Sequence, residues 1–458
     1  MAATRLVNGL SRRFGAGSGT VAGGHVGLAI DPELLERLAA GRRVALVSGT
    51  NGKTTTTRLL AEAIEGALGR AATNATGSNM PTGHVTALAE AAPGAPAVLE
   101  VDEGYLPGLV DALGPEVAVL LNLSRDQLDR TNEVRMVANK WRKALSASAS
   151  APATTTVVAN ADDPLVTWAA SASAKPVWAG AGLSWREDAI GCPACEGRIE
   201  FAPDGGGWAC SCGFARPRLD VALDGDDVVL LDGRRFPVRL ALPGRFNRAN
   251  AVMAAAAAAS MGVAWEESLE RIAAVEEVAG RFSLVEVGGC KARVMLAKNP
   301  AGWRELLDLV CPGERPVVVG INARIADGRD PSWLWDVPFE RLRGRTVVAT
   351  GERCRDLSVR LHYAEVEHRT VRDEVAAVRA AWMAARRDPA RAGRDGSEVD
   401  QGGEVDQGGE VDQGGEVDRG GEVDRGGEVD RGGEVEVDFV GNYTAFTDLH
   451  ARAMARSA

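Results

Sequence analysis

One segment near the N-terminus constrains the fold of this 458-residue chain more than any other. The sequence Gly49-Thr-Asn-Gly-Lys-Thr-Thr55 follows an apolar run, Arg43–Val47, and precedes Thr56–Leu68, whose apolar residues recur at helical spacing. Backbone N–H groups in such a loop, and at the start of the helix behind it, can hold phosphate groups. Val47 stands where the general phosphate-loop pattern has its first glycine. A strand, a loop over Ser48–Thr55 and a helix predict an α/β fold that binds a nucleoside triphosphate.

Two side chains of this loop have the chemistry that a triphosphate requires. Lys53 would neutralise the β- and γ-phosphates, and the Thr54 hydroxyl would bind Mg²⁺. Because the backbone of the loop would surround the phosphates, we expect the whole segment to contact ATP. The predicted nucleotide-binding residues of the loop are Gly49, Thr50, Asn51, Gly52, Lys53, Thr54 and Thr55.

Apolar runs of strand length alternate with helical segments along the rest of the chain, which predicts a parallel sheet with helices on both faces. The expected strands are Ala97–Val101, Val117–Asn122, Asp227–Leu231, Phe236–Leu242 and, in a second α/β unit, Ala292–Leu296, Val317–Ile321, Thr346–Thr350 and Glu436–Val440. A helix is expected over Asp31–Ala40, with Asp31 as its N-cap, and an alanine-rich helix from about Asn250. We therefore expect a lead segment over residues 1–40, a central ATP-binding domain over 41–280 and a C-terminal α/β domain over 281–458.

The net charge of −11 comes almost wholly from one low-complexity tract. Residues 398–435 repeat Glu-Val-Asp-Gln-Gly-Gly and then Glu-Val-Asp-Arg-Gly-Gly, with seven Glu, six Asp and three Arg, so the rest of the chain carries only −1. The tract has too few apolar residues to pack, which predicts a disordered loop inside the C-terminal domain. The sequence shows no signal peptide and no run of about 18 apolar residues, so we expect a cytoplasmic protein.

Four of the seven cysteines form two short pairs. Cys192 and Cys195 are separated by fourteen residues from Cys210 and Cys212, and four thiolates at this spacing suit a tetrahedral Zn²⁺. No histidine lies nearby to complete an open catalytic site, so we expect a structural zinc that folds an insertion over about 186–218. Disulfides are the alternative, which a reducing cytoplasm disfavours. A nucleic-acid-binding ribbon is not expected, because the neighbouring residues are not strongly basic.

The phosphate loop resembles that of the Mur ligase family, which also includes folylpolyglutamate synthase. Leu99-Glu-Val-Asp-Glu103 ends a predicted strand where the family carries a Mg²⁺-binding glutamate. A carboxylate suits that role, because Mg²⁺ prefers hard oxygen ligands that it shares with substrate phosphates. The resemblance implies that Glu100 binds Mg²⁺, with Asp102 and Glu103 as alternatives. A solvated acidic strand end is the other interpretation of this segment.

A further segment, Asn122–Arg130, is similar to the family's Asn-Leu-x-x-Asp-His-Leu-Asp motif. Here Gln127 replaces the histidine that binds a second metal ion in the amino-acid-adding members, so the resemblance does not extend to that second metal. Lys140 lies where those ligases carry a carbamylated lysine. An unmodified surface lysine is the alternative interpretation.

Two more segments are similar to nucleotide-contacting parts of the family. Gly244–Asn250 resembles the adenine-contacting segment, which implies that Asn247 and Asn250 bind the base. Capping the alanine-rich helix is the alternative role for these two residues. Gly280-Arg-Phe282 resembles the hinge before the C-terminal domain, which implies that Arg281 reaches the γ-phosphate. An interdomain salt bridge is its alternative role.

The cysteine cluster narrows the resemblance to the MurT family, the Mur-ligase-like synthetase subunits of lipid II isoglutaminyl synthase. Only about 40 residues precede the first strand, too few for the UDP-sugar-binding domain of the standard Mur ligases. The segments Lys298–Trp303, Ala326–Asp336 and Gly441–Ala445 are similar to the MurT C-terminal domain. The resemblance covers nearly the whole chain outside the six-residue repeat.

This resemblance implies an ATP-dependent carbon–nitrogen ligase that amidates the D-glutamate α-carboxylate of lipid II at the inner face of the membrane. ATP would activate the carboxylate as an acyl phosphate, with Lys53 and Glu100 as catalytic residues that neutralise charge. Ammonia would come from a GatD-type glutaminase in a heterodimer, since no convincing glutaminase nucleophile is present in this chain. An aspartate would orient the partner's Cys–His pair. We assign that role to Asp330, with Asp336 and Asp327 as alternatives, while a turn before Pro331 would also explain Asp330.

Two other functions stay open on the sequence alone. An amino-acid-adding ligase of the Mur or folylpolyglutamate type would need no glutaminase partner, and Gln127 and the cysteine cluster disfavour it. A nucleotide-binding scaffold without catalysis would require Lys53 or Glu100 to be dispensable.

Overall fold

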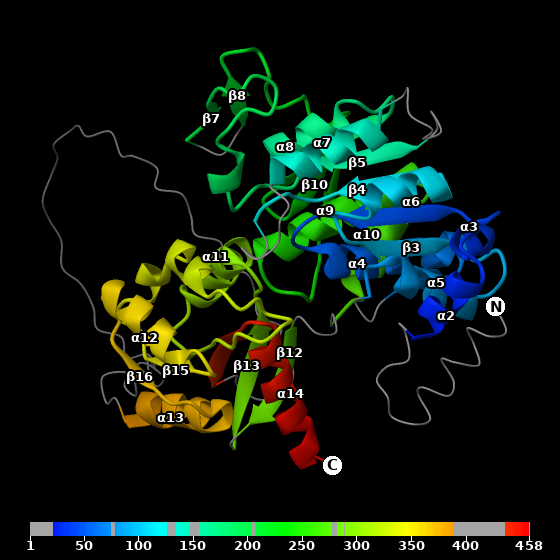
Figure 1. Cartoon of the computed structure of the whole chain (residues 1–458). Helices are drawn as coiled ribbons and strands as arrows, with labels where there is room; N and C mark the ends of the chain where they lie inside the picture. Colours follow the sequence, from blue (N-terminus) through cyan, green and yellow to red (C-terminus); the bar gives the residue numbers. More distant parts are fainter. Residues whose placement is uncertain are drawn as a thin grey trace, which may run out of the picture.

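Two large, mainly parallel sheets organise the chain (Figure 1). The computed structural model describes residues 22–74, 78–125, 134–146, 155–203, 207–276, 282–287, 289–387 and 436–457. The repeat over 398–435 and the first 21 residues of the lead segment lie outside the described residues. Parallel sheets covered by helices confirm the predicted α/β class.

In the first sheet, seven neighbouring strands run parallel, from β2 at one edge to β9. The two strands beyond β9, which are β10 and β11, pair in antiparallel fashion. In spatial order its strands are β11 (Arg235–Pro237), β10 (Asp227–Leu230), β9 (Val221–Asp224), β6 (Pro176–Gly180), β5 (Thr156–Asn160), β4 (Val117–Leu120), β1 (Val44–Ser48), β3 (Ala97–Val101) and β2 (Ala72–Thr73).

Helices cover both faces of this sheet. Ala45 and Val47 of β1 pack into a core with α4 (Lys53–Leu68), α9 (Arg245–Ser260) and α10 (Trp265–Ala273). Val44 and Leu46 pack into a second core on the opposite face. The helices of that second layer are α3 (Leu34–Ala39), α5 (Pro81–Glu90), α6 (Leu106–Leu113), α7 (Val134–Ala144) and α8 (Pro164–Ala170), and α2 (Ala22–Ile30) lies beside α5. Because successive strand residues face opposite layers, a strand buried on both sides is mostly apolar.

The second sheet combines strands from before the repeat with one strand from after it. Its strands, in spatial order, are β12 (Phe282–Val287), β13 (Cys290–Leu296), β17 (Val437–Gly441), β14 (Val317–Gly320), β15 (Val347–Thr350) and β16 (His368–Thr370). β17 therefore lies between β13 and β14, and the buried ion pair between Arg293 and Asp438 (2.8 Å) joins it to β13. The prediction that the repeat interrupts the second unit, rather than forming a tail, is confirmed.

Helices also cover both faces of the second sheet. One layer consists of α11 (Pro300–Val310), the 3₁₀ turns η2 (Ser332–Asp336) and η3 (Phe339–Leu342), and α12 (Cys354–Tyr363). The other consists of α13 (Glu374–Arg387) and α14 (Tyr443–Ser457).

Several helix starts differ from the prediction. The helix expected over Asp31–Ala40 begins only at Leu34, and the Asp31 carboxylate accepts the backbone N–H of Glu33 in the turn before it. α2 is not among the helices expected from the sequence. The loop after β1 is shorter than expected, because α4 begins at Lys53, directly after Gly52 with its left-handed φ of 87°. The first turn contains three threonines, and their β-branched side chains have low helix propensity, so the sequence does not predict a helix there.

Further differences lie at strand ends and at the alanine-rich helix, and strands such as β5, β6 and β9 are not among those expected from the sequence. α9 begins at Arg245 after Gly244, not near Asn250. β11 ends at Pro237, well before the predicted Leu242, since proline offers no N–H to a sheet ladder.

The cysteine-containing insertion forms a small ribbon of its own beyond α8 (Figure 1). The ribbon consists of β7 (Ile199–Phe201) and β8 (Trp208–Cys210), which pair in antiparallel fashion, and η1 (Glu187–Ala189) lies in the segment that leads into it. The Trp208 indole N–H donates to the carbonyl of Ala161 (3.0 Å), and Arg216 pairs with Asp162 (2.6 Å). Because Ala161 and Asp162 directly follow β5, the ribbon is fixed at the carboxyl end of that strand.

Candidate active site

The predicted phosphate loop lies at the carboxyl ends of the central strands. β1 pairs in parallel with both β3 and β4, so the three strands end at one edge of the sheet. A Cβ on Gly49 would lie 2.8 Å from the Cβ of Leu121, and one on Gly52 would lie 2.5 Å from the Asn250 side-chain oxygen. The close approach at Gly49 and the left-handed φ of 87° at Gly52 both favour glycine. Ligands of open α/β sheets bind at this edge.

The Lys53 side chain folds back over the loop. Its ammonium donates to the carbonyls of Gly49 (2.5 Å) and Thr50 (3.1 Å) and forms an ion pair with Glu103 (3.3 Å). Only 8% of Lys53 is exposed. A phosphate would offer this charge a stronger acceptor than two backbone carbonyls, so the position fits the predicted role of Lys53.

Glu100 has a buried carboxylate oxygen without a hydrogen-bond partner among the described residues. The residue is 3% exposed, and it follows Val98 on the face of β3 that packs against α4. Of the alternatives, Asp102 accepts the backbone N–H of Gly104, and Glu103 pairs with Lys53. A buried, unpartnered oxygen is what a cation ligand requires, and Glu100 pairs in register with Val47, close to where β1 ends and the loop begins. These observations favour Glu100.

Asn122 locks the loop to the segment after β4. Its side-chain oxygen accepts the backbone N–H of Asn51 (2.9 Å), and its amide donates to the Asn51 carbonyl (3.0 Å). Asp163, the N-cap of α8, holds the same segment by accepting the backbone N–H of Leu123 (2.8 Å). Complete burial raises the pKa of Asp163 to about 6.

Gln127 lies outside the described residues, and Lys140 is exposed on α7.

The predicted adenine-contacting residues lie in the first turns of α9. Gly244, and not an asparagine, occupies the N-cap position, so capping does not explain Asn247 or Asn250. Asn247 is buried and donates to the carbonyl of Pro243 (2.6 Å). Asn250 contacts the phosphate loop at Gly52, as described above. Arg281 lies outside the described residues.

A contact between the loop and the second sheet unit is not predicted by the sequence. The Asn51 side chain donates to the side-chain oxygen of Asn299 (3.2 Å), and the same oxygen accepts the backbone N–H of Gly302 (3.0 Å). Asn299 is fully buried and is the N-cap of α11. Asparagine followed by proline at the first helical position is a sequence signal for such a cap, but it does not reveal the partner.

Two further contacts join α11 to the segment before the ribbon. The Ser184 hydroxyl donates to the Glu305 carboxylate (3.0 Å), and Arg304 pairs with Glu187 (2.9 Å). Burial raises the pKa of Glu305 to about 7, although the Ser184 hydrogen bond opposes this shift. α11 therefore contacts both the phosphate loop and the segment that leads into the ribbon.

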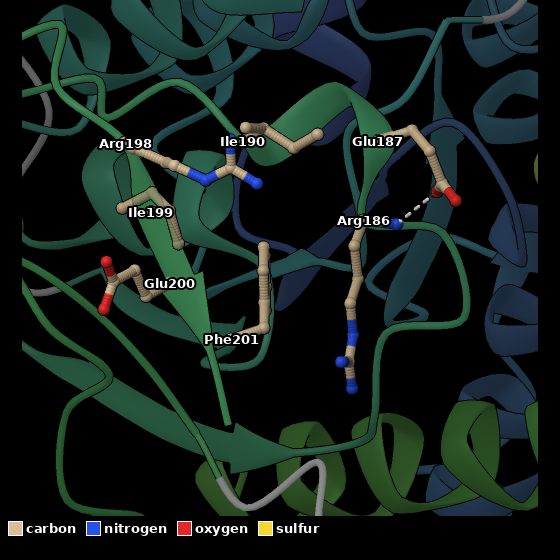
Figure 2. A pocket seen from close by; sticks show the side chains of 7 residues that line it. All are labelled: Arg186, Glu187, Ile190, Arg198, Ile199, Glu200 and Phe201. Atoms are coloured by element: carbon tan, nitrogen blue, oxygen red, sulfur yellow. Dashed lines mark hydrogen bonds between the residues drawn. The ribbon is translucent and has the colours of Figure 1, made fainter. Parts of the chain in front are cut away.

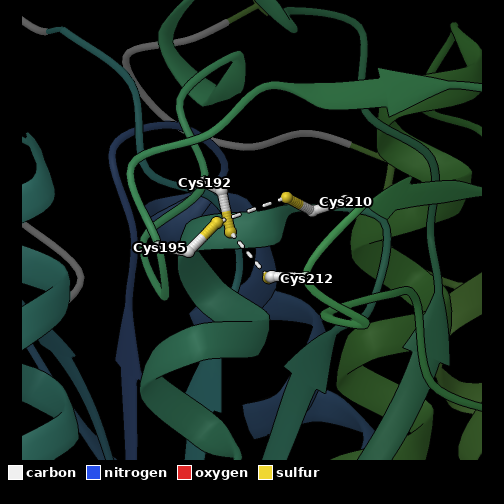
Figure 3. A group of neighbouring side chains, drawn as sticks. All are labelled: Cys192, Cys195, Cys210 and Cys212. Carbon is white, nitrogen blue, oxygen red and sulfur yellow. Dashed lines mark hydrogen bonds between the residues drawn. The ribbon is translucent and has the colours of Figure 1, made fainter.

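The four cysteines of the ribbon converge as predicted (Figure 3). All four sulfur atoms lie within 4.8 Å of one another, with 3.8 Å between Cys192 and Cys212 and 3.5 Å between Cys195 and Cys210. Zn–S bonds of about 2.3 Å in a tetrahedron place sulfur atoms roughly 3.8 Å apart. The cluster thus has the geometry of a possible metal site. The remaining cysteines, Cys290, Cys311 and Cys354, lie outside this cluster, and two of them are buried.

The three candidate aspartates of the second unit have different surroundings. Asp327 is buried and accepts hydrogen bonds from the backbone and hydroxyl of Thr444, which is a structural role. Asp336 is exposed and lies 3.9 Å from Arg125. Asp330 is exposed, and its carboxylate accepts the backbone N–H of Ser332 (2.8 Å). Only Asp330 and Asp336 therefore present a carboxylate at the surface.

Comparisons with known proteins agree with this geometry. Residues 47–192 match the Mur ligase middle domain, and residues 296–389 match the MurT ligase C-terminal family. The MurT subunit of lipid II isoglutaminyl synthase (glutamine-hydrolyzing) from Staphylococcus aureus strain COL is 29% identical over 79% of this chain and 87% of that protein. The same subunit from Streptococcus pneumoniae R6 is 30% identical over 71% of this chain and 77% of that protein. The chain belongs to the MurT family.

MurT-family membership makes this chain an enzyme of the ATP-dependent Mur ligase type, with the Mur-ligase-like parallel fold. A pseudomurein peptide ligase type C from Methanothermus fervidus shares that fold, with a TM-score of 0.59 at 19% identity over 91% of this chain and 79% of that protein. Among the described residues, no helix has the length and apolar character to cross a membrane.

Proposed function

We propose that this MurT-family chain is the synthetase subunit of a lipid II isoglutaminyl synthase. It uses ATP to convert the α-carboxylate of D-glutamate in the lipid II stem peptide into an amide, which yields D-isoglutamine for peptidoglycan synthesis. The observation that carries the proposal is the buried, unpartnered oxygen of Glu100 beside the phosphate loop, in a chain whose second unit matches MurT. The names of the two MurT relatives support the same reaction.

Different residues at the sheet edge bind different parts of ATP. The loop from Gly49 to Thr55 surrounds the phosphates, and Lys53 exchanges its two carbonyl acceptors for the β- and γ-phosphates. Thr54 and Glu100 hold Mg²⁺, which neutralises phosphate charge when bound. Asn247, Asn250 and Arg281 complete the nucleotide site, with the two asparagines at the base and Arg281 at the γ-phosphate.

The reaction replaces a poor leaving group with a good one. An oxygen of the substrate carboxylate forms a bond to the γ-phosphorus of ATP, and ADP leaves. Ammonia then attacks the carbonyl carbon of the acyl phosphate, loses a proton and expels phosphate. The chain contributes position and charge neutralisation, which together account for most of the catalysis in phosphoryl transfer.

Ammonia must arrive unprotonated, which favours delivery from a GatD-type glutaminase partner in a heterodimer. We assign the role of orienting that partner's Cys–His pair to Asp330, because it is exposed and lies two residues before the start of η2. Trp335 of η2 is 54% exposed and packs edge-on against Tyr363, which is 70% exposed. Exposed aromatic pairs are typical of protein interfaces, so this surface supports docking next to Asp330.

Three further assignments belong to the same proposal. The cluster of Cys192, Cys195, Cys210 and Cys212 holds a structural Zn²⁺. The domains extend over residues 1–40, 41–280 and 281–458, with the ribbon inserted at about 186–218. The enzyme works in the cytoplasm, at the inner face of the membrane that holds its lipid-linked substrate.

The test uses the full chain with and without its glutaminase partner, and it supplies lipid II, ATP and either glutamine or ammonium. The proposal expects amidated lipid II from ammonium with either preparation, and from glutamine only with the partner. Incorporation of a free amino acid would instead identify an amino-acid-adding ligase. Nucleotide binding without any product would identify a scaffold.

A further inference from the structure

A hollow of about 500 Å³ lies between the ribbon and the segment that leads into it (Figure 2). The segment contributes Arg186, Glu187 and Ile190, and β7 with the residue before it contributes Arg198, Ile199, Glu200 and Phe201. The hollow is distinct from the phosphate loop, and its residues have no role in the nucleotide site described above. Its size is within the range of small-molecule sites.

The charges around this hollow are uneven. Figure 2 shows the Arg198 side chain and the Phe201 ring directed into the space, while the carboxylates of Glu187 and Glu200 point outward. Glu187 is already paired with Arg304. Neither Arg186 nor Arg198 forms an ion pair with any carboxylate in the part of the chain that the structure describes. The hollow thus offers two guanidinium groups without carboxylate partners.

An apolar surface accompanies these charges. The Arg186 guanidinium lies 5.1 Å from the centre of the Phe201 ring, and Ile190 is 40% exposed. Guanidinium groups bind phosphates and carboxylates through paired N–H donors, and they stack on aromatic rings at the same time. A ligand that fits both features carries an anionic group next to an apolar segment.

The hollow is anchored at the functional edge of the first sheet. Arg125, which follows β4, pairs with Asp188 (2.5 Å), and the Trp185 indole N–H donates to the same carboxylate (2.7 Å). Arg304, the partner of Glu187, lies on α11, whose N-cap Asn299 contacts the phosphate loop. One helix therefore connects the rim of the hollow to the loop where the γ-phosphate would lie.

We propose that this hollow is a substrate subsite, which binds an anionic group of the lipid-linked substrate, a phosphate or a carboxylate, together with its apolar neighbour. The inference rests on the proposed function for the identity of that substrate. It also gives the ribbon a role, because the ribbon places Arg198 and Phe201 opposite Arg186. The ribbon then acts as a wall of the substrate site.

The test is steady-state kinetics of the complete complex with the variants Arg198→Glu and Arg186→Ala. Both should raise the KM for lipid II by about tenfold or more, which corresponds to the loss of a charge-assisted hydrogen bond. The KM for ATP and kcat should stay within about twofold of wild type, because neither residue contacts the phosphate loop. Unchanged KM values for lipid II in both variants would overturn the proposal.

Arg234 provides the matched control, because its guanidinium is also exposed and lies 5.9 Å from a phenylalanine ring, that of Phe236. Arg234→Glu should leave every kinetic constant unchanged. Melting temperature and zinc content of all three variants check that the ribbon still folds. An equal rise in KM for Arg234→Glu would show a general charge effect and would overturn the subsite.

Two additional arms identify the anion and separate this inference from the proposed function. A rise in KM for lipid II but not for its lipid-free peptide assigns the anion to the lipid-linked phosphates, and a rise for both assigns it to a peptide carboxylate. Binding of lipid II in detergent micelles requires no turnover. Binding that depends on Arg198 in a complex that makes no amide would overturn the proposed function and retain the subsite. Normal amidation kinetics in both Arg198→Glu and Arg186→Ala would overturn the subsite and retain the proposed function.

Discussion

Asn51 in the phosphate loop and Asn299 at the start of α11 are 248 positions apart in the sequence, yet their side-chain amides meet at 3.2 Å. The Asn299 oxygen that accepts this hydrogen bond also caps α11 through Gly302. A single atom therefore fixes the start of a helix in the second unit and one residue of the loop. We infer that nucleotide binding and the orientation of the second unit are coupled through this oxygen.

Replacement of Asn299 by serine separates the two roles of this oxygen. Serine still caps a helix, but its shorter side chain does not reach Asn51. We expect Asn299→Ser to weaken ATP binding by about three- to tenfold, the effect of one lost hydrogen bond, with little change in melting temperature. Asn299→Ala should lose the cap as well, at a cost of about 1 kcal/mol in the free energy of unfolding. Calorimetric titration with ATP measures the first effect, and wild-type affinity in Asn299→Ser would contradict the coupling.

Glu100→Gln tests the predicted Mg²⁺ ligand. The change keeps the shape of the side chain and removes its charge, so we expect kcat to fall by about 100-fold or more. The melting temperature without Mg²⁺ should not fall, because the buried carboxylate oxygen has no hydrogen bond to lose among the described residues. Asp102→Asn is the matched control, and its kcat should stay within about twofold of wild type. If Asp102→Asn were the inactive variant, the metal ligand would be Asp102.

Much of this site could be predicted from local sequence. The sequence predicts the strand Ala97–Val101 to the residue, because a strand buried on both faces is mostly apolar, and Glu100 is its one charged residue. The spacing of the glycines and Lys53 predicts a phosphate-binding loop, and the spacing of the paired cysteines predicts a metal site. Partners such as Asn299 and Ser184 were missed, since a hydrogen bond across the chain leaves no local pattern. The start of α4 was missed because helix packing outweighs the low helix propensity of its threonines.

Glu305 makes stability depend on pH in a defined direction. Burial raises its pKa from 4.5 to about 7, so the folded chain binds more protons than the unfolded chain between these values. The stability it contributes is fully present below about pH 4.5 and is lost as the pH rises through about 7. Glu305→Gln removes the titration and keeps an acceptor for Ser184. The melting temperature of the variant relative to wild type should therefore rise from pH 5 to pH 8, and a constant difference would contradict this assignment.

The ribbon should depend on its metal. Fresh protein should contain about one zinc ion per chain, as four thiolates in a tetrahedron bind a single ion. Cys195→Ser should lower the zinc content and the melting temperature, because the ribbon has only a small core around Trp208. Cys311→Ser is the matched control, since this cysteine lies outside the cluster. A full zinc content in Cys195→Ser would exclude that residue as a ligand.

Asp330→Asn separates glutamine hydrolysis from amidation. In complex with the glutaminase, the variant should lose glutamine-dependent amidation by about 100-fold or more, because the partner's histidine loses its orienting carboxylate. Amidation with added ammonium should stay near the wild-type rate. Asp336→Asn serves as the control, as its carboxylate is also exposed. Normal glutamine use by Asp330→Asn with loss in Asp336→Asn would move the role to Asp336.

The central claim is that this chain activates a carboxylate with ATP, and oxygen transfer tests it most directly. Lipid II carrying oxygen-18 in the D-glutamate α-carboxylate is incubated with the complex, ATP and ammonium, and the released phosphate is analysed by mass spectrometry. The acyl-phosphate route predicts one labelled oxygen in phosphate for each amide formed. Amide formation with no label in the phosphate would contradict it.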